Sequence, residues 1–209
     1  MSGENEHCAR DPQTKQAETV TSPEERLKHP LEHRWSFWYH TNDRNRTWQE
    51  NLLEIASFDT VEDFWAVYNH MKRPSEIAQG CDYSMFKYGI KPMWEDSRNR
   101  RGGRWFVKLG KVEAATDNCW LEILMCLIGE GFDERGADVC GAVVQVREKA
   151  DKVSVWTADC RSVESNRQIK EIMKKKLEMH IGTKSSIYYQ VHDDTKTKER
   201  SSKKAREAV

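Results

Sequence analysis

The chain has 209 residues, and its 34 lysines and arginines are balanced by 34 aspartates and glutamates, so the formal net charge is zero. This balance argues against a general binder of duplex or single-stranded nucleic acid, which would carry a basic stripe, but it permits recognition of one nucleotide through a few phosphate contacts. No apolar run reaches membrane-spanning length, and the six cysteines show no paired spacing, so we expect no membrane span, zinc site or disulfide framework.

Both ends of the chain are poor in apolar side chains. Residues 1–28 contain six of them and residues 192–209 contain three. Neither segment can bury enough surface to offset its chain entropy, so we predict a disordered N-terminal tail and a flexible, basic C-terminal tail. Residues 29–191 then form the folded unit, which is long enough for one domain with its own core.

Hydrophobic patterning divides this unit into strands and helices. Runs that alternate or are rich in β-formers occur at 34–40, 83–88, 103–109, 139–147, 153–156 and 186–191. Helices are expected after Thr60, over about 118–128 and over about 165–180. Strands joined by hairpin-sized turns, with three helices on one face, predict an α+β domain with a mostly antiparallel sheet.

Cap and stripe signals mark the first and third helices. Thr60 is placed at an N-cap with Asp63 three residues later, which is close to a capping box. The stripe of the first helix is Val61, Phe64, Trp65 and Tyr68, and that of the third is Ile169, Ile172, Met173 and Leu177. Such stripes are typical of helices that pack on a core.

The second helix carries more apolar residues than one face can hold. One side of its helical wheel consists of Trp120, Ile123, Leu124 and Leu127. Leu121 and Met125 point away from that side, next to Glu122. Either a neighbouring loop covers them, or they form a docking site for another protein.

Two tryptophans stand in charged loops, where aromatic residues are unexpected. Trp48 lies in a polar loop, and Trp94 follows a proline and directly precedes Glu95. Two facing indoles can hold a flat cation between them, and a neighbouring carboxylate can accept hydrogen bonds from the edge of the same ligand. A flat cationic heterocycle with N–H donors on its edge, such as methylated guanine, fits both features.

A predicted hairpin carries a second set of polar residues. A four-residue turn at 148–151 would set Arg147 opposite Lys152, with Trp156 on the same face. Like charges opposed across two strands are unfavourable. Either both side chains extend into water, or an anion such as a phosphate chain bridges them.

Other chemistry finds little support in the sequence. His29 and His33 are four apart, but Pro30 makes a helical zinc pair doubtful. The chain has no phosphate-loop signature, and no serine or cysteine stands in a nucleophile elbow. We therefore expect no catalytic set, metal or cofactor.

Eight strings spread in order across the folded unit resemble one family, the eukaryotic translation initiation factor 4E proteins that bind the messenger-RNA cap. They are HPL at 29–31, TWQ at 47–49, FDTVEDFW at 58–65, GCDY at 80–83, MWED at 93–96, RGGRW at 101–105, WLE at 120–122 and CGAVV at 140–144. The resemblance implies a curved antiparallel sheet of eight strands with three helices on its convex face and the cap in the concave slot.

The resemblance also assigns roles to individual residues. Trp48 and Trp94 would stack on 7-methylguanine, Glu95 would accept its N–H donors, and Trp156 would lie against the N7-methyl group. The cap phosphates would be held by Arg104, Arg147 and Lys152.

On the opposite face, the resemblance implies a surface for a helical peptide from the initiation scaffold factor 4G or from 4E-binding repressor proteins. It consists of His29, Pro30, Val61, Trp65, Leu121, Glu122 and Met125. Ser201, in the basic tail, is a candidate phosphorylation site, because the family carries a regulatory phosphoserine at a comparable distance from its end. The expected location is the cytoplasm, with the nucleus as a further compartment.

Three functions compete on this basis. The first is a non-enzymatic cap receptor that recruits messenger RNA for translation, and the second is a cap-binding repressor that does not engage the scaffold. Val61, Trp65 and Leu121 favour the first. The third is a cap-modifying enzyme, which would need a carboxylate cluster where this chain offers arginine and lysine.

Overall fold

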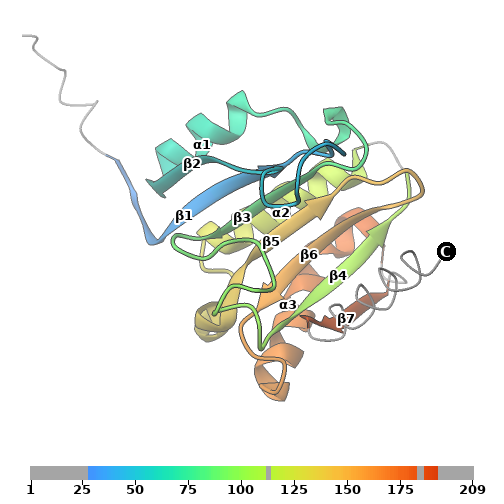
Figure 1. Ribbon diagram of the computed structural model, residues 1–209. Coiled ribbons are helices and arrows are strands. Elements are labelled where there is room, and N and C mark those ends of the chain that lie inside the picture. The colour runs from blue at the N-terminus through green and yellow to red at the C-terminus, as the bar shows by residue number, and fades with distance from the viewer. Residues whose placement is uncertain (1–27, 112–113, 183–185, 193–209) are drawn as a thin grey trace, which may run out of the picture.

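The computed structural model describes residues 28–111, 114–182 and 186–192. Within them a seven-stranded sheet forms in the order β2-β1-β3-β5-β6-β4-β7, and every neighbouring pair is antiparallel. The strands are β1 (Pro30–His40), β2 (Leu52–Thr60), β3 (Asp82–Lys87), β4 (Gly103–Leu109), β5 (Val139–Gln145), β6 (Asp151–Thr157) and β7 (Ile187–Val191). Figure 1 looks onto one face of this sheet, with α2 and α3 behind it.

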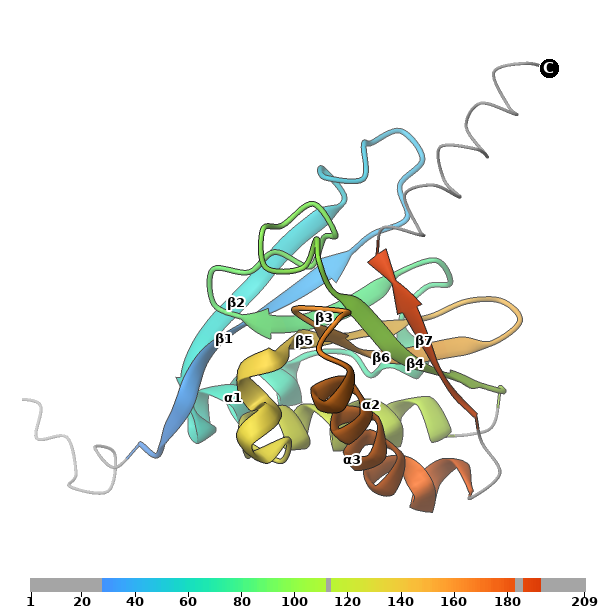
Figure 2. The same cartoon turned by 90° about the horizontal axis from the view of Figure 1, so that it is seen from below.

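Three α-helices accompany the sheet. They are α1 (Val61–His70), α2 (Ala115–Ile128) and α3 (Val163–Ile181), and two short 3₁₀ turns, η2 (Pro74–Glu76) and η3 (Asp133–Asp138), complete the fold. Figure 2 shows the three helices on one side of the curved sheet. The α+β class, the antiparallel sheet and the helices on its convex face are therefore confirmed, with seven strands in the described residues where eight were implied.

The helix boundaries follow local sequence signals. At the start of α1, the Oγ1 of Thr60 accepts a hydrogen bond from the Asp63 backbone N–H at 3.2 Å and donates one to the Asp63 carboxylate at 2.7 Å. The C-cap of α2 is Gly129, as expected, and its N–H donates to the Met125 carbonyl. Each arrangement satisfies backbone or side-chain groups that a helix end leaves open.

Burial of the alternating strand residues against the helices makes the core. The strands contribute Phe37, Met85, Val144, Val153 and Val155, and the helices contribute Phe64, Trp120, Ile123, Ile169, Met173 and Leu177. All are less than 2% exposed. Removal of this much apolar surface from water is the main stabilising contribution to the fold.

Strand β2 was not predicted from the sequence. It is an edge strand that pairs only with β1 in the described sheet, and Leu53 and Ile55 on it are 47% and 44% exposed. Its apolar residues are not confined to one buried face, so the period-two pattern that identifies a half-buried strand is weak here.

The predicted hairpin register was wrong by two residues. Gln145, not Arg147, pairs with Lys152, and Arg147 lies beyond the end of β5. The ladder stops because the Arg147 N–H donates to the side chain of Asp151 instead of to a strand partner. A shift of two residues preserves the side-chain face, so Arg147, Lys152 and Trp156 still share one face of the sheet.

The Thr60 cap provides a test of this account of α1. We expect Thr60→Ala to lower the free energy of unfolding by about 1 kcal/mol, because the first turn of α1 loses its side-chain acceptor. Thr60→Ser keeps the hydroxyl and should stay close to the parent protein. Urea unfolding followed by circular dichroism measures both, and equal stabilities of the two variants would contradict the cap.

Candidate binding site on the concave face

The face of the sheet that the helices do not cover carries a second, smaller apolar cluster. Trp156 is 7% exposed and packs edge-on against Phe86, with ring centroids 5.3 Å apart. Its indole also lies 4.2 Å from the ring of His192, directly after β7. This concave face therefore has a rigid aromatic centre rather than a purely polar surface.

Four cations from β4, β6 and the end of β5 lie on the same face as this centre. Arg104 pairs with Trp156, and Lys108 pairs with Lys152. The pKa of Lys152 is lowered, first by burial of its ammonium group and then by the neighbouring positive charges of Arg104, Lys108 and Arg147, while Asp82 opposes the shift. An ammonium group whose charge is disfavoured by burial and by neighbouring cations is suited to an anion that touches several of these groups.

Two polar side chains orient Arg104. Its Nε and Nη2 donate to Gln190 at 3.2 and 2.9 Å, and its Nη1 donates to Gln145 at 3.4 Å. The guanidinium of Arg104 is thereby held between Gln190 on β7 and Gln145 on β5. A guanidinium fixed in this way is pre-organised for an anion.

Asp82 holds Arg147 in place. Its two carboxylate oxygens accept hydrogen bonds from Nη1 and Nη2 of Arg147 at 2.5 and 3.1 Å, a bidentate arrangement. Nη1 also donates to the carbonyls of Cys81 and Val146. Arg147 is therefore oriented at the end of β5 before any ligand arrives.

Sequence reasoning missed several members of this region, among them the charged residues Asp82 and Lys108. Lys108 alternates with Arg104 and Phe106 along β4, so strand periodicity contained the signal that places it beside Lys152. Asp82 has no comparable signal, because its role depends on pairing with a residue 65 positions away.

Trp94 and Glu95 lie in a loop between β3 and β4 that is held from within. The side-chain amide of Asn99, which is fully buried, donates to the carbonyls of Lys91 and Met93 at 2.8 and 2.9 Å. The carboxylate of Asp96 accepts from the N–H groups of Lys91 and Arg98. These bonds fix the backbone around Trp94, which is partly buried, and Glu95, which is exposed.

Trp48 lies in the loop between β1 and β2 and is 46% exposed. The loop is closed by the buried side chain of Asn51, whose Nδ2 donates to the carbonyls of Asp43 and Thr47 at 2.9 and 3.1 Å. The indole packs on the ring of His40 with centroids 5.3 Å apart. Figure 2 shows that both tryptophan-bearing loops rise on the side of the sheet away from the helices.

The residues predicted for a partner surface lie on the opposite side. The His29 carbonyl accepts from the Val61 N–H at 2.9 Å, and the His29 ring contacts Glu62 at 2.6 Å. Trp65 is partly buried against Phe64, with ring centroids 5.1 Å apart.

The adjoining residues of α2 remain accessible. Met125 is 39% exposed, Leu121 is partly exposed, and Glu122 lies 3.8 Å from the ammonium of Lys176 on α3. The structure thus leaves Met125 open, as the docking interpretation of this helix requires.

Some predictions fall on chain ends that the structure does not describe. Ser201 and almost all of both predicted tails lie outside the described residues. At their inner edges, the ammonium of Lys28 contacts Asp63 at 2.7 Å, and His192 is 3% exposed.

Among residues 28–111, 114–182 and 186–192, none of the helices combines the length and the apolar character that a membrane span requires. No group of three or more histidine, cysteine, aspartate or glutamate side chains in the same residues is arranged to hold a metal ion.

Comparisons with known proteins agree on one family. The family model described as eukaryotic initiation factor 4E matches residues 30–207. Eukaryotic translation initiation factor 4E of Homo sapiens is 48% identical over 207 residues, covering 98% of this chain and 94% of that protein.

Solved structures give the same result. The complex of C. elegans eIF4E-3 with the 4E-binding protein Mextli and a cap analog has a TM-score of 0.78 at 46% identity, covering 82% of this chain and 96% of that one. Ascaris suum eIF4E-3 with an m2,2,7G cap has a TM-score of 0.77 at 49% identity, covering 79% and 92%.

The lowered pKa of Lys152 can be tested by removing its neighbours. Arg104→Ala removes a positive charge and should raise the pKa of Lys152, whereas Asp82→Asn removes a negative charge and should lower it further. Titration of the Lys152 side chain by NMR measures both shifts. Lys174→Ala on α3 is a control that should leave the value unchanged, and shifts of the same sign in the two test variants would contradict the cluster.

Proposed function

The chain belongs to the eukaryotic initiation factor 4E family, and on this basis we propose that it binds the 7-methylguanosine cap of messenger RNA and recruits that RNA for translation through a scaffold factor. The observation that carries the proposal is the concave face, where a cluster of four cations lies on the same side of the sheet as Trp156 and two tryptophan-bearing loops. Related chains were solved with m7G and m2,2,7G caps.

The cap base would be held by stacking between indole rings and by hydrogen bonds from its edge to a carboxylate. Trp48 and Trp94 would enclose the cationic 7-methylguanine, with Trp156 at the methyl group, because indole faces attract a delocalised positive charge. The exposed carboxylate of Glu95 would accept the N–H donors of the base. The hydrogen bonds of Asn99 and Asn51 hold the two loops before binding and so reduce the ordering cost.

The cap phosphates would lie over the cation cluster. Arg104, Arg147 and Lys152 are the proposed contacts, and Lys108 adds a fourth charge beside Lys152. Burial and then the neighbouring cations lower the pKa of Lys152, and a phosphate chain would relieve the part that is due to the cations. The carboxylate of Asp82 would keep Arg147 in position while the Arg147 guanidinium binds the anion.

The convex side would receive the protein partner. We propose that a helical segment of the scaffold factor 4G, or of a competing 4E-binding repressor, docks on the surface formed by His29, Pro30, Val61, Trp65, Leu121, Glu122 and Met125. Related chains were solved with Mextli and with 4E-BP. The exposure of Met125 and the partial exposure of Trp65 and Leu121 favour a recruiting factor over a cap-binding repressor that does not engage the scaffold.

We further propose that the role is binding without catalysis. In the described residues the phosphate region is mainly cationic, and its carboxylate Asp82 is engaged by Arg147. A cap-modifying enzyme would need free carboxylates there for a metal or a general base. The proposed location is the cytoplasm, where messenger RNA is translated, with the nucleus as a further compartment, and Ser201 remains a proposed phosphorylation site.

Cap recognition is tested with methylated and unmethylated nucleotides. We expect at least about a tenfold preference for 7-methyl-GTP over GTP, because only the methylated base is cationic. Trp48→Ala and Trp94→Ala should each abolish most of the binding in a fluorescence titration. Tyr88→Ala, which removes another exposed aromatic residue, should bind normally. Equal affinity of the parent protein for the two nucleotides would refute the stacking site.

Trp65 separates the two binding activities. Trp65→Ala should keep cap affinity within about twofold and lose a scaffold or repressor peptide by roughly thirtyfold, because it truncates an anchor on the face opposite the cap. Calorimetry with the peptide and with 7-methyl-GTP measures both. Met179→Ala, on a fully accessible part of α3, should affect neither. An unfolded Trp65→Ala protein, or parallel loss of both ligands, would identify Trp65 as a core residue.

A further inference from the structure

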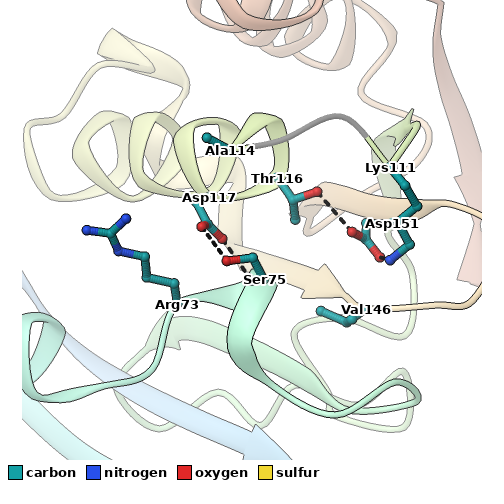
Figure 3. Close-up of a pocket in the computed structure, with 8 residues that line it drawn as sticks. All are labelled: Arg73, Ser75, Lys111, Ala114, Thr116, Asp117, Val146 and Asp151. Carbon is teal, nitrogen blue, oxygen red and sulfur yellow. Dashed lines mark hydrogen bonds and ion pairs between the residues drawn. The ribbon is translucent and has the colours of Figure 1, made fainter.

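A polar cavity of about 360 Å³ lies near the beginning of β6, between η2 and the first turn of α2. Figure 3 shows two aspartates in its wall, Asp117 from α2 and Asp151 from β6. Both are largely buried, at 8% and 5% exposure. Buried carboxylates are costly unless hydrogen bonds compensate them, so their partners indicate what each one holds in place.

Asp151 is bonded to three separate segments of the chain. One carboxylate oxygen accepts from the Lys111 ammonium at 2.6 Å and from the Arg147 backbone N–H at 2.9 Å. The other accepts from the Thr116 hydroxyl at 3.0 Å. The end of β4, the first turn of α2 and the end of β5 thus meet at one side chain.

Asp117, in the same cavity, has different partners. Its carboxylate accepts from the backbone N–H and the hydroxyl of Ser75 at 2.9 and 2.6 Å. These bonds join α2 to η2 and do not reach the 145–152 hairpin. Asp117 therefore matches Asp151 in residue type and burial but lacks its connection to the phosphate region.

Asp151 connects to the phosphate region at a point where the β5–β6 ladder has already ended. The β5–β6 ladder ends at the Gln145–Lys152 pair, so Arg147 has no strand partner on the β6 side. The carboxylate of Asp151 takes the place of that partner by accepting the Arg147 N–H, and Lys152 follows Asp151 directly. The Asp151 side chain, on the helix side of the sheet, is therefore connected through the backbone to two cations on the concave side, Arg147 and Lys152.

We propose that Asp151 is a positioning residue for cap-phosphate binding, acting through the backbone of Arg147 and the start of β6. The inference rests on the proposed cap-binding function. Without Asp151, the turn from Arg147 to Lys152 would have to be ordered when the phosphates bind, and that cost would weaken binding of the phosphates and not of the base.

The test compares a ligand with phosphates and a ligand without them. Asp151→Ala should weaken 7-methyl-GTP binding roughly tenfold, the equivalent of one misplaced charge-assisted hydrogen bond, and leave 7-methylguanosine within about twofold. Its salt dependence for 7-methyl-GTP should also become flatter, because fewer phosphate contacts form. Asp117→Ala, the matched control, should leave the affinity ratio of the two ligands unchanged.

If Asp151→Ala does not fold, a pair of less disruptive variants at Thr116 tests the positioning role of Asp151. Thr116→Val removes one donor to Asp151 and should lower the affinity ratio of 7-methyl-GTP to 7-methylguanosine, and Thr116→Ser should restore it. Circular dichroism and urea unfolding establish that each protein tested is folded.

The outcomes separate this inference from the function on which it rests. If the parent protein prefers 7-methyl-GTP over GTP but the ratio is unchanged in folded Asp151→Ala, or in Thr116→Val where Asp151→Ala is unfolded, the positioning role is wrong. The same holds if Asp117→Ala lowers the ratio equally. If the parent protein binds neither methylated ligand, the proposed function fails and the inference fails with it.

Discussion

Because side chains alternate along a strand with a period of two residues, each central strand of this sheet packs one set of side chains into the core and presents the other set on the concave face. Along β6, Val153 and Val155 enter the core beneath the helices, while Lys152 and Trp156 face the concave side. Burial on the helix side stabilises the sheet strongly enough to hold like charges together on the other. The binding surface therefore depends on the core directly behind it.

The concave face also shows how several cations can be held close together by the fold itself. Burial and neighbouring cations lower the pKa of Lys152, which marks the cluster as electrostatically unfavourable on its own. Asp82 offsets part of this by pairing with Arg147. Neutral amides from Gln145 and Gln190 hold Arg104 without cancelling its charge. The result is a pre-organised cluster whose repulsion a ligand can relieve.

Much of this arrangement could be predicted from the sequence, and the exceptions have physical reasons. The Thr60 cap, the end of α2 at Gly129 and the shared face of Lys152 and Trp156 depend on local signals, and all three are present. Strand β2 was missed because its apolar residues do not alternate with burial, and the hairpin register was wrong because the Asp151 side chain replaces a ladder hydrogen bond. Asp82 was missed because its role depends on a long-range partner.

The order of the strands has a consequence for synthesis of the protein. The strand β4 lies between β6 and β7, and β3 lies beside β5, so several of the neighbouring strands that make the concave face are distant along the chain. Long-range pairings of this kind form late in folding, because each must first close a large loop. A chain emerging from the ribosome cannot assemble the cation cluster until Thr157, the end of β6, has been made. The cation cluster therefore forms only after most of the folded unit has been synthesised.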